Sequence, residues 1–261
     1  MVRPTGPSRP LEPLRLLEPS RLLDIGCGTG ALLKSLNGIS SIRSRDGSKT
    51  GCDISLSMLV RARDANGVKA GFCAADFETL PFRDSSFSLI ASSLTYQWAA
   101  DTGAAFREAW RVLRPGGLFF FSTLGPLTLN ELCASYRDAF LKRDPGGTVR
   151  FMSFLEVKEI EEALGASGLE VIAVERKAEE KAYADAFELL KTLKGVGALR
   201  RAEDGIGGLK KAVILKEAAR IYGERYASTR KAASSQGGVA ATYDVIYVSA
   251  RKAWQGVEKQ R

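Results

Sequence analysis

Short apolar runs alternate with amphipathic segments over the first half of the chain. The run at 21–25 ends in a glycine-rich turn, which predicts a buried parallel strand. Further strands are predicted at 50–53, 68–74, 87–93 and 118–123, with helices at 31–36, 57–64 and 102–113. Ser55 is a plausible N-cap for the second helix, and Pro115-Gly116-Gly117 ends the third. Strands alternating with helices at this spacing predict a parallel sheet with right-handed crossovers.

The pattern changes beyond Leu124. Helices are predicted at 127–141 and 154–164, and a strand at 169–175. The segment 242–252, TYDVIYVSARK, alternates apolar and polar residues, which predicts an antiparallel strand at or near a sheet edge. About 60 residues separate these last two strands, too many for a bare loop, and they include basic helices at 184–194 and 209–230. We interpret the segment from about 183 to 232 as a helical cap over the substrate side.

These elements define the expected architecture. We predict an α/β fold with a doubly wound, mostly parallel seven-stranded sheet and an inserted helical cap. The proline-rich residues 1–20 are expected to form an irregular lead-in, and residues 21–261 a single domain.

Composition narrows the possible functions. Hydrophobic residues make up 45% of the chain and charged residues 26%, as in ordinary soluble domains, and no apolar run is long enough to span a membrane. The N-terminus lacks the apolar region of a signal peptide, and four cysteines without CxxC spacing fit a reducing cytoplasm. The chain contains no histidine, which removes histidine-based catalytic triads and metal sites, and we expect no metal. A net charge of +8 favours an anionic partner, such as nucleic acid, a membrane surface or an acidic protein.

The glycine-rich turn, Asp24-Ile25-Gly26-Cys27-Gly28-Thr29-Gly30, is the first candidate for chemistry. With Ala31 it satisfies the dinucleotide pattern G-x-G-x-x-G/A, which would place a pyrophosphate at the helix N-terminus. However, a carboxylate at Asp24 would repel a pyrophosphate. It suits a cationic ligand instead, such as the ammonium of a methionyl group.

Two further acids follow predicted strands. Asp53 ends the second strand, where a carboxylate can hold both ribose hydroxyls, although capping of the next helix is an alternative. Asp76 ends the third strand and can accept a hydrogen bond from an adenine amino group, with Phe77 beside the ring. In a dinucleotide site, no particular interaction is expected for the Asp76-Phe77 pair.

Five segments together resemble the successive motifs of class I methyltransferases: LLDIGCGTG, GCDISLSML, ADFETLPF, SSLTYQW and REAWRVLRPGG. The resemblance implies S-adenosylmethionine as the cofactor. It also implies a cofactor pocket lined by Asp24, Gly26, Gly28, Asp53, Ile54, Met58, Asp76, Phe77 and Ser93. For Met58 a place in the helix core is an open alternative.

A wider resemblance, from about residue 21 to 252, is to the malonyl-acyl-carrier-protein O-methyltransferases of biotin synthesis, the BioC family. It adds STLGPLTLNEL, RFMSF, LLKTLKGVGA and TYDVIYVSARK. It implies methyl transfer to the free carboxylate of a malonyl thioester, on acyl carrier protein or coenzyme A. A carboxylate is ionised at pH 7 and needs no general base, so no catalytic side chain is expected. Arg150 is the expected clamp for the substrate carboxylate, and Gln97 and Trp98 are expected at the substrate entrance. A solvated arginine and a packing tryptophan are the alternatives.

Other functions remain to be compared. Acyl carrier proteins are acidic, so the basic cap offers a complementary surface. A nucleic-acid methyltransferase would also explain the charge, but the Asn/Asp-Pro-Pro-Tyr element expected after the fourth strand is missing, so nucleic acid is not the expected partner. The arginine hydroxylase of complex I assembly shares some motifs, yet it would need iron ligands or another oxidant site.

Members of the BioC family carry a longer N-terminal segment that closes over the cofactor. A non-catalytic S-adenosylmethionine-binding protein without that lid is therefore a further alternative. We expect a cytoplasmic monomer.

Overall fold

The computed structural model describes residues 21–36, 49–65, 67, 69–195, 208–228 and 238–254. The predicted lead-in at 1–20 and parts of the predicted cap, 196–207 and 229–237, lie outside these residues. The chain divides into two compact units. Unit 1 comprises Met1–Thr123, Lys158–Glu175 and Tyr247–Arg261, and unit 2 comprises Leu124–Val157 and Arg176–Ile246.

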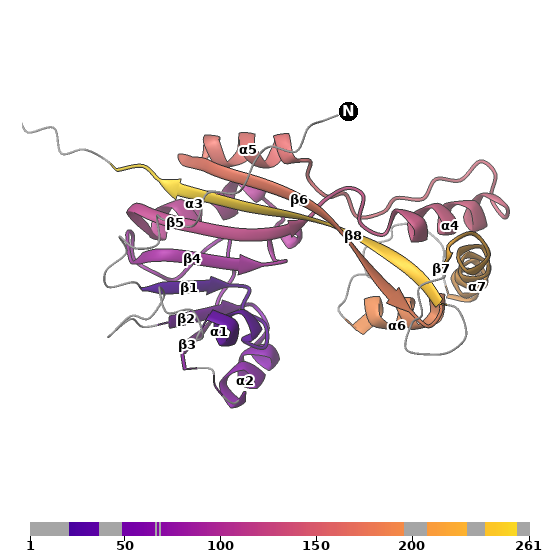
Figure 1. The fold of residues 1–261 in the computed structure, drawn as a ribbon, viewed down its shortest axis with the longest axis horizontal. Helices are drawn as coiled ribbons and strands as arrows, with labels where there is room; N and C mark the ends of the chain where they lie inside the picture. The colour runs from indigo at the N-terminus through magenta and orange to yellow at the C-terminus, as the bar shows by residue number, and fades with distance from the viewer. Residues whose placement is uncertain are drawn as a thin grey trace, which may run out of the picture. The chain divides into compact units, whose positions relative to one another are not determined.

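The sheet confirms the predicted fold class. Its strands run in the order β3-β2-β1-β4-β5-β8-β6, which can be followed from bottom to top in Figure 1, and β8 runs against the others. A two-residue strand, β7 (Ala227–Ser228), pairs antiparallel with the start of β8. The seven main strands are β1 (Leu22–Ile25), β2 (Lys49–Asp53), β3 (Gly71–Ala74), β4 (Phe87–Ser93), β5 (Leu113–Leu124), β6 (Leu169–Tyr183) and β8 (Gly238–Lys252).

Helices occur close to the predicted ranges. Ser55 stands at the N-cap position of α2 without a side-chain hydrogen bond, whereas the Asp101 carboxylate caps α3 by accepting from Ala104 N. None of the helices in the described residues is long and apolar enough to cross a membrane. Their bounds are α1 (Ala31–Leu36), α2 (Leu56–Asp64), the 3-10 helix η3 (Tyr96–Trp98), α3 (Thr102–Val112), α4 (Asn130–Leu141), α5 (Val157–Ala166), α6 (Ala186–Gly195) and α7 (Gly208–Arg225).

Helices cover both faces of the sheet in unit 1. On one face, Leu33 of α1 packs with Leu89 and Leu118. On the other, Phe106 of α3 packs against Phe119 and Phe121 of β5. Successive residues of a strand point to opposite faces, so the apolar run LFFF in β5 supplies both cores. This explains why the strand reads as continuously hydrophobic.

Several elements differ from their predicted bounds, and three of them show why. β5 begins at Leu113 rather than 118, because residues 114–117 bulge opposite Ser88 while the pairing continues on either side. β6 continues through the polar stretch 176–183 to Tyr183. Helix α4 starts at Asn130, since Leu129 has a left-handed φ of 56°. In each case the backbone pairing or turn overrides the side-chain pattern.

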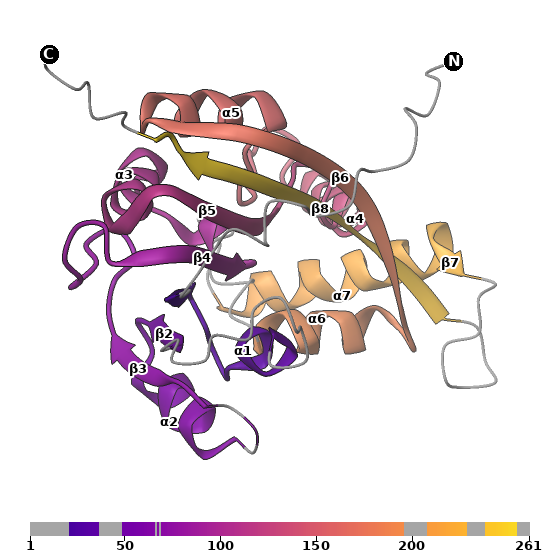
Figure 2. The same ribbon diagram turned by 60° about the vertical axis from the view of Figure 1, so that its left-hand side comes forward.

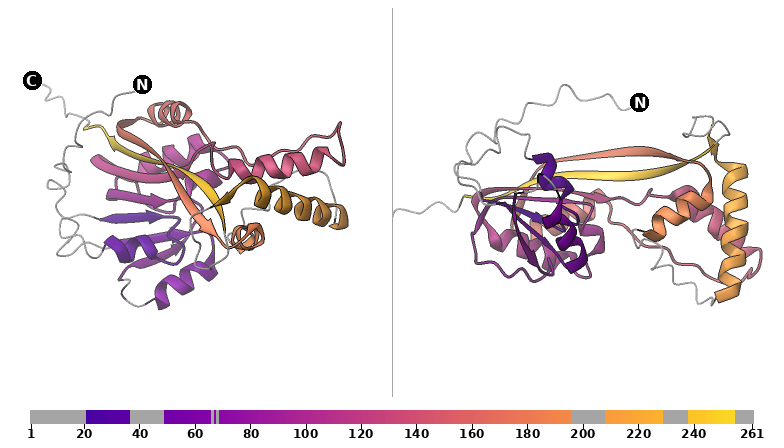
Figure 3. Two further views of the ribbon diagram at one scale, coloured as in Figure 1. Left: turned by 45° about the vertical axis from the view of Figure 1, so that its right-hand side comes forward. Right: turned by 90° about the horizontal axis from the view of Figure 1, so that it is seen from below.

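Unit 2 contains α4, which follows β5, and the helices α6 and α7 between β6 and β8. Phe140 of α4 packs with Ile214 and Ile221 of α7, and Leu189 of α6 packs with Tyr222 of α7. Figures 2 and 3 show these three helices together. Arg176 binds the buried Asp244 in a two-pronged ion pair of 2.8 and 2.7 Å, which lowers the pKa of the Asp244 carboxyl.

Candidate functional site

Parallel pairing brings the predicted acids to one edge of the sheet in unit 1. In register, Ile25 lies opposite Cys52 on one side and Ser92 on the other, and Asp53 lies opposite Ala74. The carboxyl ends of β1 to β4 therefore lie side by side. Ligands of open α/β sheets bind outside these ends, where the strand order reverses. This edge is the candidate site.

The glycine turn after β1 is tied to β2, because Cys27 N donates to Cys52 O at 2.9 Å. Gly26 and Gly28 both have a left-handed φ, of 68° and 52°. A Cβ at Gly26 would collide with the buried side chain of Thr95, whereas a Cβ at Gly28 would meet nothing within 4 Å. Gly26 is thus required for packing, and Gly28 leaves open space where a ligand can approach the backbone.

The two glycines should respond differently to alanine. Gly26→Ala is expected to destabilise the fold by about 2 kcal/mol or more, through the clash with Thr95 and the positive φ. Gly28→Ala should cost only about 1 kcal/mol of stability but reduce cofactor affinity strongly, because its methyl group occupies the open space. Thermal unfolding and calorimetric titration of both variants measure this. Equal loss of affinity without a difference in stability would contradict these roles.

Asp24, at the end of β1, is 1% exposed, and neither of its carboxylate oxygens has a hydrogen-bond partner among the described residues. Burial, and secondarily the charge of Asp53, raise the pKa of Asp24 to about 7. A buried carboxyl without a partner is energetically costly. A cationic group brought to Asp24 would relieve that cost.

Asp53 is half-buried and already organises the edge. Its Oδ2 accepts a hydrogen bond from Gly28 N at 2.9 Å, and its Oδ1 accepts one from Ser55 N at 2.8 Å. The same carboxylate therefore joins the glycine turn to the start of α2. A carboxylate has about four acceptor positions, so capacity remains for hydroxyl donors such as a ribose diol.

The next strand end carries Asp76 and Phe77. Asp76 is exposed, and its Oδ1 accepts from Glu78 N at 2.9 Å. Phe77 is half-buried, with its ring 5.4 Å from that of Tyr96. An acceptor next to an aromatic face is suited to a purine carrying an amino group.

Exposed apolar side chains lie along the same edge. Ile54 is 75% exposed, Met58 38% and Leu94 43%. Met58 is not among the buried residues of α2, which are Leu59 and Ala62. Exposed apolar groups beside unpartnered polar ones are typical of a ligand site.

The remaining site candidates, namely Ser93 for the cofactor and Gln97, Trp98 and Arg150 for the substrate, are divided between the two units. Ser93 is exposed at the end of β4. In the η3 segment after it, Gln97 Nε2 donates to Leu94 O at 2.6 Å, Gln97 Oε1 accepts from Thr123, and Trp98 is 37% exposed. Arg150 belongs to unit 2 and is exposed, and its guanidinium makes no ion pair within the described residues. The structure thus gathers the cofactor candidates, Gln97 and Trp98 in unit 1, and leaves Arg150 in the other unit.

Sequence patterns missed the residues that support this edge. Thr95 packs onto Gly26, and its hydroxyl donates to Ile25 O at 3.3 Å. Arg111 holds the segment after β3, donating to Leu80 O at 2.8 Å and Phe82 O at 2.7 Å. Glu108 accepts from Leu80 N at 2.7 Å. Both Arg111 and Glu108 lie in the motif REAWRVLRPGG, but nothing in the spacing of that motif indicates which loop they hold.

The edge carries groups that would suit S-adenosylmethionine. The buried Asp24 would suit a cation, the free acceptor positions of Asp53 would suit a diol, and the Asp76-Phe77 pair would suit an adenine. An ionised carboxylate at Asp24 would repel the pyrophosphate of a dinucleotide. The fold and this edge together are those of a methyltransferase.

Comparisons with known proteins also indicate a methyltransferase. A family model described as "Methyltransferase domain" matches residues 23–121. A crystal structure of a putative methyltransferase (BH2331) from Bacillus halodurans superposes with a TM-score of 0.60 at 15% identity, covering 92% of this chain and 96% of that one. At that identity the likeness shows the fold alone.

Curated relatives extend the match beyond that domain. The malonyl-[acyl-carrier protein] O-methyltransferase of Geobacter sulfurreducens is 34% identical over 226 residues, 86% of this chain and 80% of the relative. The mitochondrial arginine-hydroxylase NDUFAF5 of Danio rerio is 32% identical over 196 residues, 75% of this chain and 59% of the relative. The chain belongs to the class I S-adenosylmethionine-dependent methyltransferases.

Proposed function

We propose that this methyltransferase transfers a methyl group to the free carboxylate of a malonyl thioester carried by acyl carrier protein, as in early biotin synthesis. The observation that carries the proposal is the 34% identity to the Geobacter sulfurreducens protein over 86% of the chain. That match extends through unit 2, well outside the residues 23–121 that the methyltransferase domain itself explains.

In this proposal the site residues divide the cofactor between them. Asp24 binds the methionyl ammonium, Asp53 binds the ribose hydroxyls, and Asp76 with Phe77 takes the adenine. Gly26 and Gly28 bring the backbone close to the ligand, and Ile54, Met58 and Ser93 complete the walls. When bound, S-adenosylmethionine supplies an electrophilic methyl group on a sulfonium.

The protein has little chemistry to perform on the acceptor. A malonyl carboxylate is ionised at neutral pH, so its oxygen forms the new C–O bond without losing a proton to a base. The protein contributes position and a partly desolvated environment. A site without histidine suits such a reaction, since no proton has to be moved.

The relation to arginine hydroxylases gives a weaker alternative. The chain spans 59% of the Danio rerio protein but 80% of the Geobacter sulfurreducens methyltransferase. We therefore retain methylation of a malonyl thioester as the proposed reaction.

Labelled methyl transfer tests the proposal directly. With tritiated S-adenosylmethionine, label should appear on malonyl-acyl carrier protein and, more weakly, on malonyl-coenzyme A. Acetyl-acyl carrier protein has no free carboxylate and is the matched control. Absence of label from both malonyl thioesters, with the cofactor still binding, would eliminate this substrate class while leaving the methyltransferase family intact.

Arg150 is the proposed clamp on the substrate carboxylate. Arg150→Ala should lower turnover of malonyl-acyl carrier protein and malonyl-coenzyme A alike, by about 100-fold if the contact is desolvated. Arg150→Lys should recover only part of this, because an ammonium lacks the two-pronged donor geometry of a guanidinium. Steady-state kinetics of both variants with both substrates measures the effect, and unchanged kinetics would assign the clamp to another cation.

A further inference from the structure

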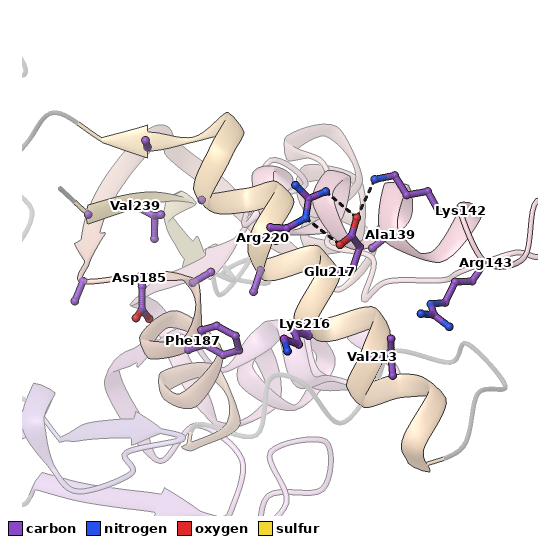
Figure 4. A pocket seen from close by; sticks show the side chains of 16 residues that line it. Ala139, Lys142, Arg143, Asp185, Phe187, Val213, Lys216, Glu217, Arg220 and Val239 are labelled. Carbon is purple, nitrogen blue, oxygen red and sulfur yellow. Dashed lines mark hydrogen bonds and ion pairs between the residues drawn. The ribbon is translucent and has the colours of Figure 1, made fainter. Parts of the chain in front are cut away.

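Unit 2 contains a groove with a volume of about 970 Å³, shown in Figure 4. It is lined by α4, the start of α6, one side of α7 and the strands β7 and β8. Many of the residues that line it are small, namely Ala139, Ala184, Ala186, Ala219, Gly223, Ala227 and Gly238. Small side chains along a groove leave room for a partner's side chains to enter.

The cations of the groove are only partly neutralised. Lys142 and Arg220 both bind Glu217, at 2.9 Å each, as the dashed lines in Figure 4 show. Hydrogen bonds from Arg220 and Lys142 lower the pKa of Glu217 to about 2, so this acid stays ionised and engaged. Arg143 and Lys216 make no ion pair or side-chain hydrogen bond within the described part of the chain.

The other acid in the groove also has a role inside the fold. Asp185 Oδ1 accepts a hydrogen bond from Glu188 N at 2.8 Å, at the start of α6. Both groove acids are thus occupied by the protein's own donors. Arg143 and Lys216 are left as positive charge available to a partner.

Two exposed apolar side chains lie among these charges. Phe187 is 57% exposed and Val213 37% exposed, and both line the groove with Lys216. Aromatic residues and arginine are enriched at protein interfaces, and unpaired cations steer an acidic partner towards them. Phe187 is exposed at the start of α6, whereas Leu189 and Leu193 of the same helix are buried.

We propose that this groove is the docking site for the acidic surface of the acyl carrier protein. Arg143 and Lys216 attract its carboxylates, and Phe187 and Val213 receive an apolar side chain between them. The inference deepens the proposed function and rests on it for the identity of the partner. It concerns how the carrier is recognised, a task separate from methyl transfer.

Charge reversal provides the test. Arg143→Glu combined with Lys216→Glu should raise the KM for malonyl-acyl carrier protein about 10-fold at low salt, with little change in kcat. The effect should shrink at high salt, because exposed charges are screened over about 8 Å at physiological ionic strength. Malonyl-N-acetylcysteamine, which has neither a carrier protein nor a phosphate, should be methylated as before. Phe187→Ser should also raise the KM for the carrier, but without the salt dependence.

The matched control reverses two exposed cations of unit 1, Lys158→Glu with Arg63→Glu, which changes the net charge equally. Its KM for the carrier should stay near the wild-type value. An equal rise in the control would mean that only net charge matters, and an unchanged KM in the groove variant would remove the groove as the docking site. Either result overturns the proposal.

Binding without turnover separates this proposal from the proposed function. Fluorescence anisotropy with labelled holo-acyl carrier protein, which has no malonyl group, should show weaker binding to the groove variant than to the wild type and the control. If the wild-type protein binds the carrier but methylates no malonyl thioester, the proposed reaction fails and the docking site stands. If it binds no carrier at all, the docking site fails whatever the reaction.

Discussion

Replacing Asp24 with asparagine is expected to stabilise the ligand-free protein at pH 8 and to remove most of its affinity for S-adenosylmethionine. The carboxyl is 1% exposed and without hydrogen-bond partners among the described residues, and burial raises its pKa from 3.8 to about 7. Such a group binds its proton more tightly in the folded than in the unfolded state. Its contribution to stability is therefore fully present below about pH 4 and is lost as the pH rises to about 7.

The size of this effect follows from the pKa shift. About three pKa units correspond to at most about 4 kcal/mol at pH 8, and the buried amide of asparagine will offset part of the gain. Chemical denaturation of wild type and Asp24→Asn between pH 5 and pH 8 measures it. The wild-type free energy of unfolding should fall towards pH 7 relative to the variant. Parallel curves would contradict the burial of an unpartnered acid.

The ionised carboxylate of Asp24 should destabilise the ligand-free fold but strengthen the binding of S-adenosylmethionine. A bound ammonium favours the ionised carboxylate, so losing that charge should weaken binding by about 2–5 kcal/mol. In the wild type, affinity should fall as the pH drops below 7, and binding should release a proton, which calorimetry in buffers of different ionisation enthalpy detects. Asp64→Asn, which removes an exposed acid on α2 outside the candidate site, is the control for general charge effects. Retained affinity in Asp24→Asn would move the ammonium elsewhere.

Replacing Asp53 with alanine should weaken S-adenosylmethionine binding by about 2–3 kcal/mol, the scale of lost charge-assisted hydrogen bonds. The variant loses the proposed contacts to the ribose and also the acceptors for Gly28 N and Ser55 N. Calorimetric titration gives the affinity, and NADH should bind to neither protein. Tight NADH binding would overturn the cofactor assignment.

Two further variants separate the roles of Asp53. Asp53→Asn keeps one oxygen to accept from the backbone but lacks the negative charge, so its stability should be closer to wild type than that of Asp53→Ala. Its affinity for S-adenosylmethionine should nevertheless stay low if the negative charge of Asp53 is needed to bind the ribose hydroxyls. Asp64→Ala, on the exposed last turn of α2 where it pairs with Arg63, is the matched control and should bind normally. Normal affinity in Asp53→Asn would restrict Asp53 to holding the turn.

Much of the fold could be predicted because its signals are local. The strand at 87–93 and the helix at 31–36 match their predicted bounds, since an apolar run and an amphipathic turn each reflect burial by neighbouring layers. The edge that gathers Asp24, Asp53 and Asp76 was also predictable, because parallel strands end on the same side. The extensions of β6 and β8 were not, because residues 176–183 and 238–241 join the strands through backbone pairing that leaves no clear side-chain pattern.

The sequence by itself determined the class of protein and the types of group at its site. The spacing of the glycines and acids that follow the strands is enough to indicate both. Only the tertiary structure decided the state of those groups. Burial of Asp24 by residues distant in the chain, and not its place in a motif, raises its pKa to about 7. Likewise, a Cβ at Gly26 would collide with the side chain of Thr95, whereas a Cβ at Gly28 would only fill open space. Solvation and packing arise between segments far apart in sequence, so they exist only once the chain has folded.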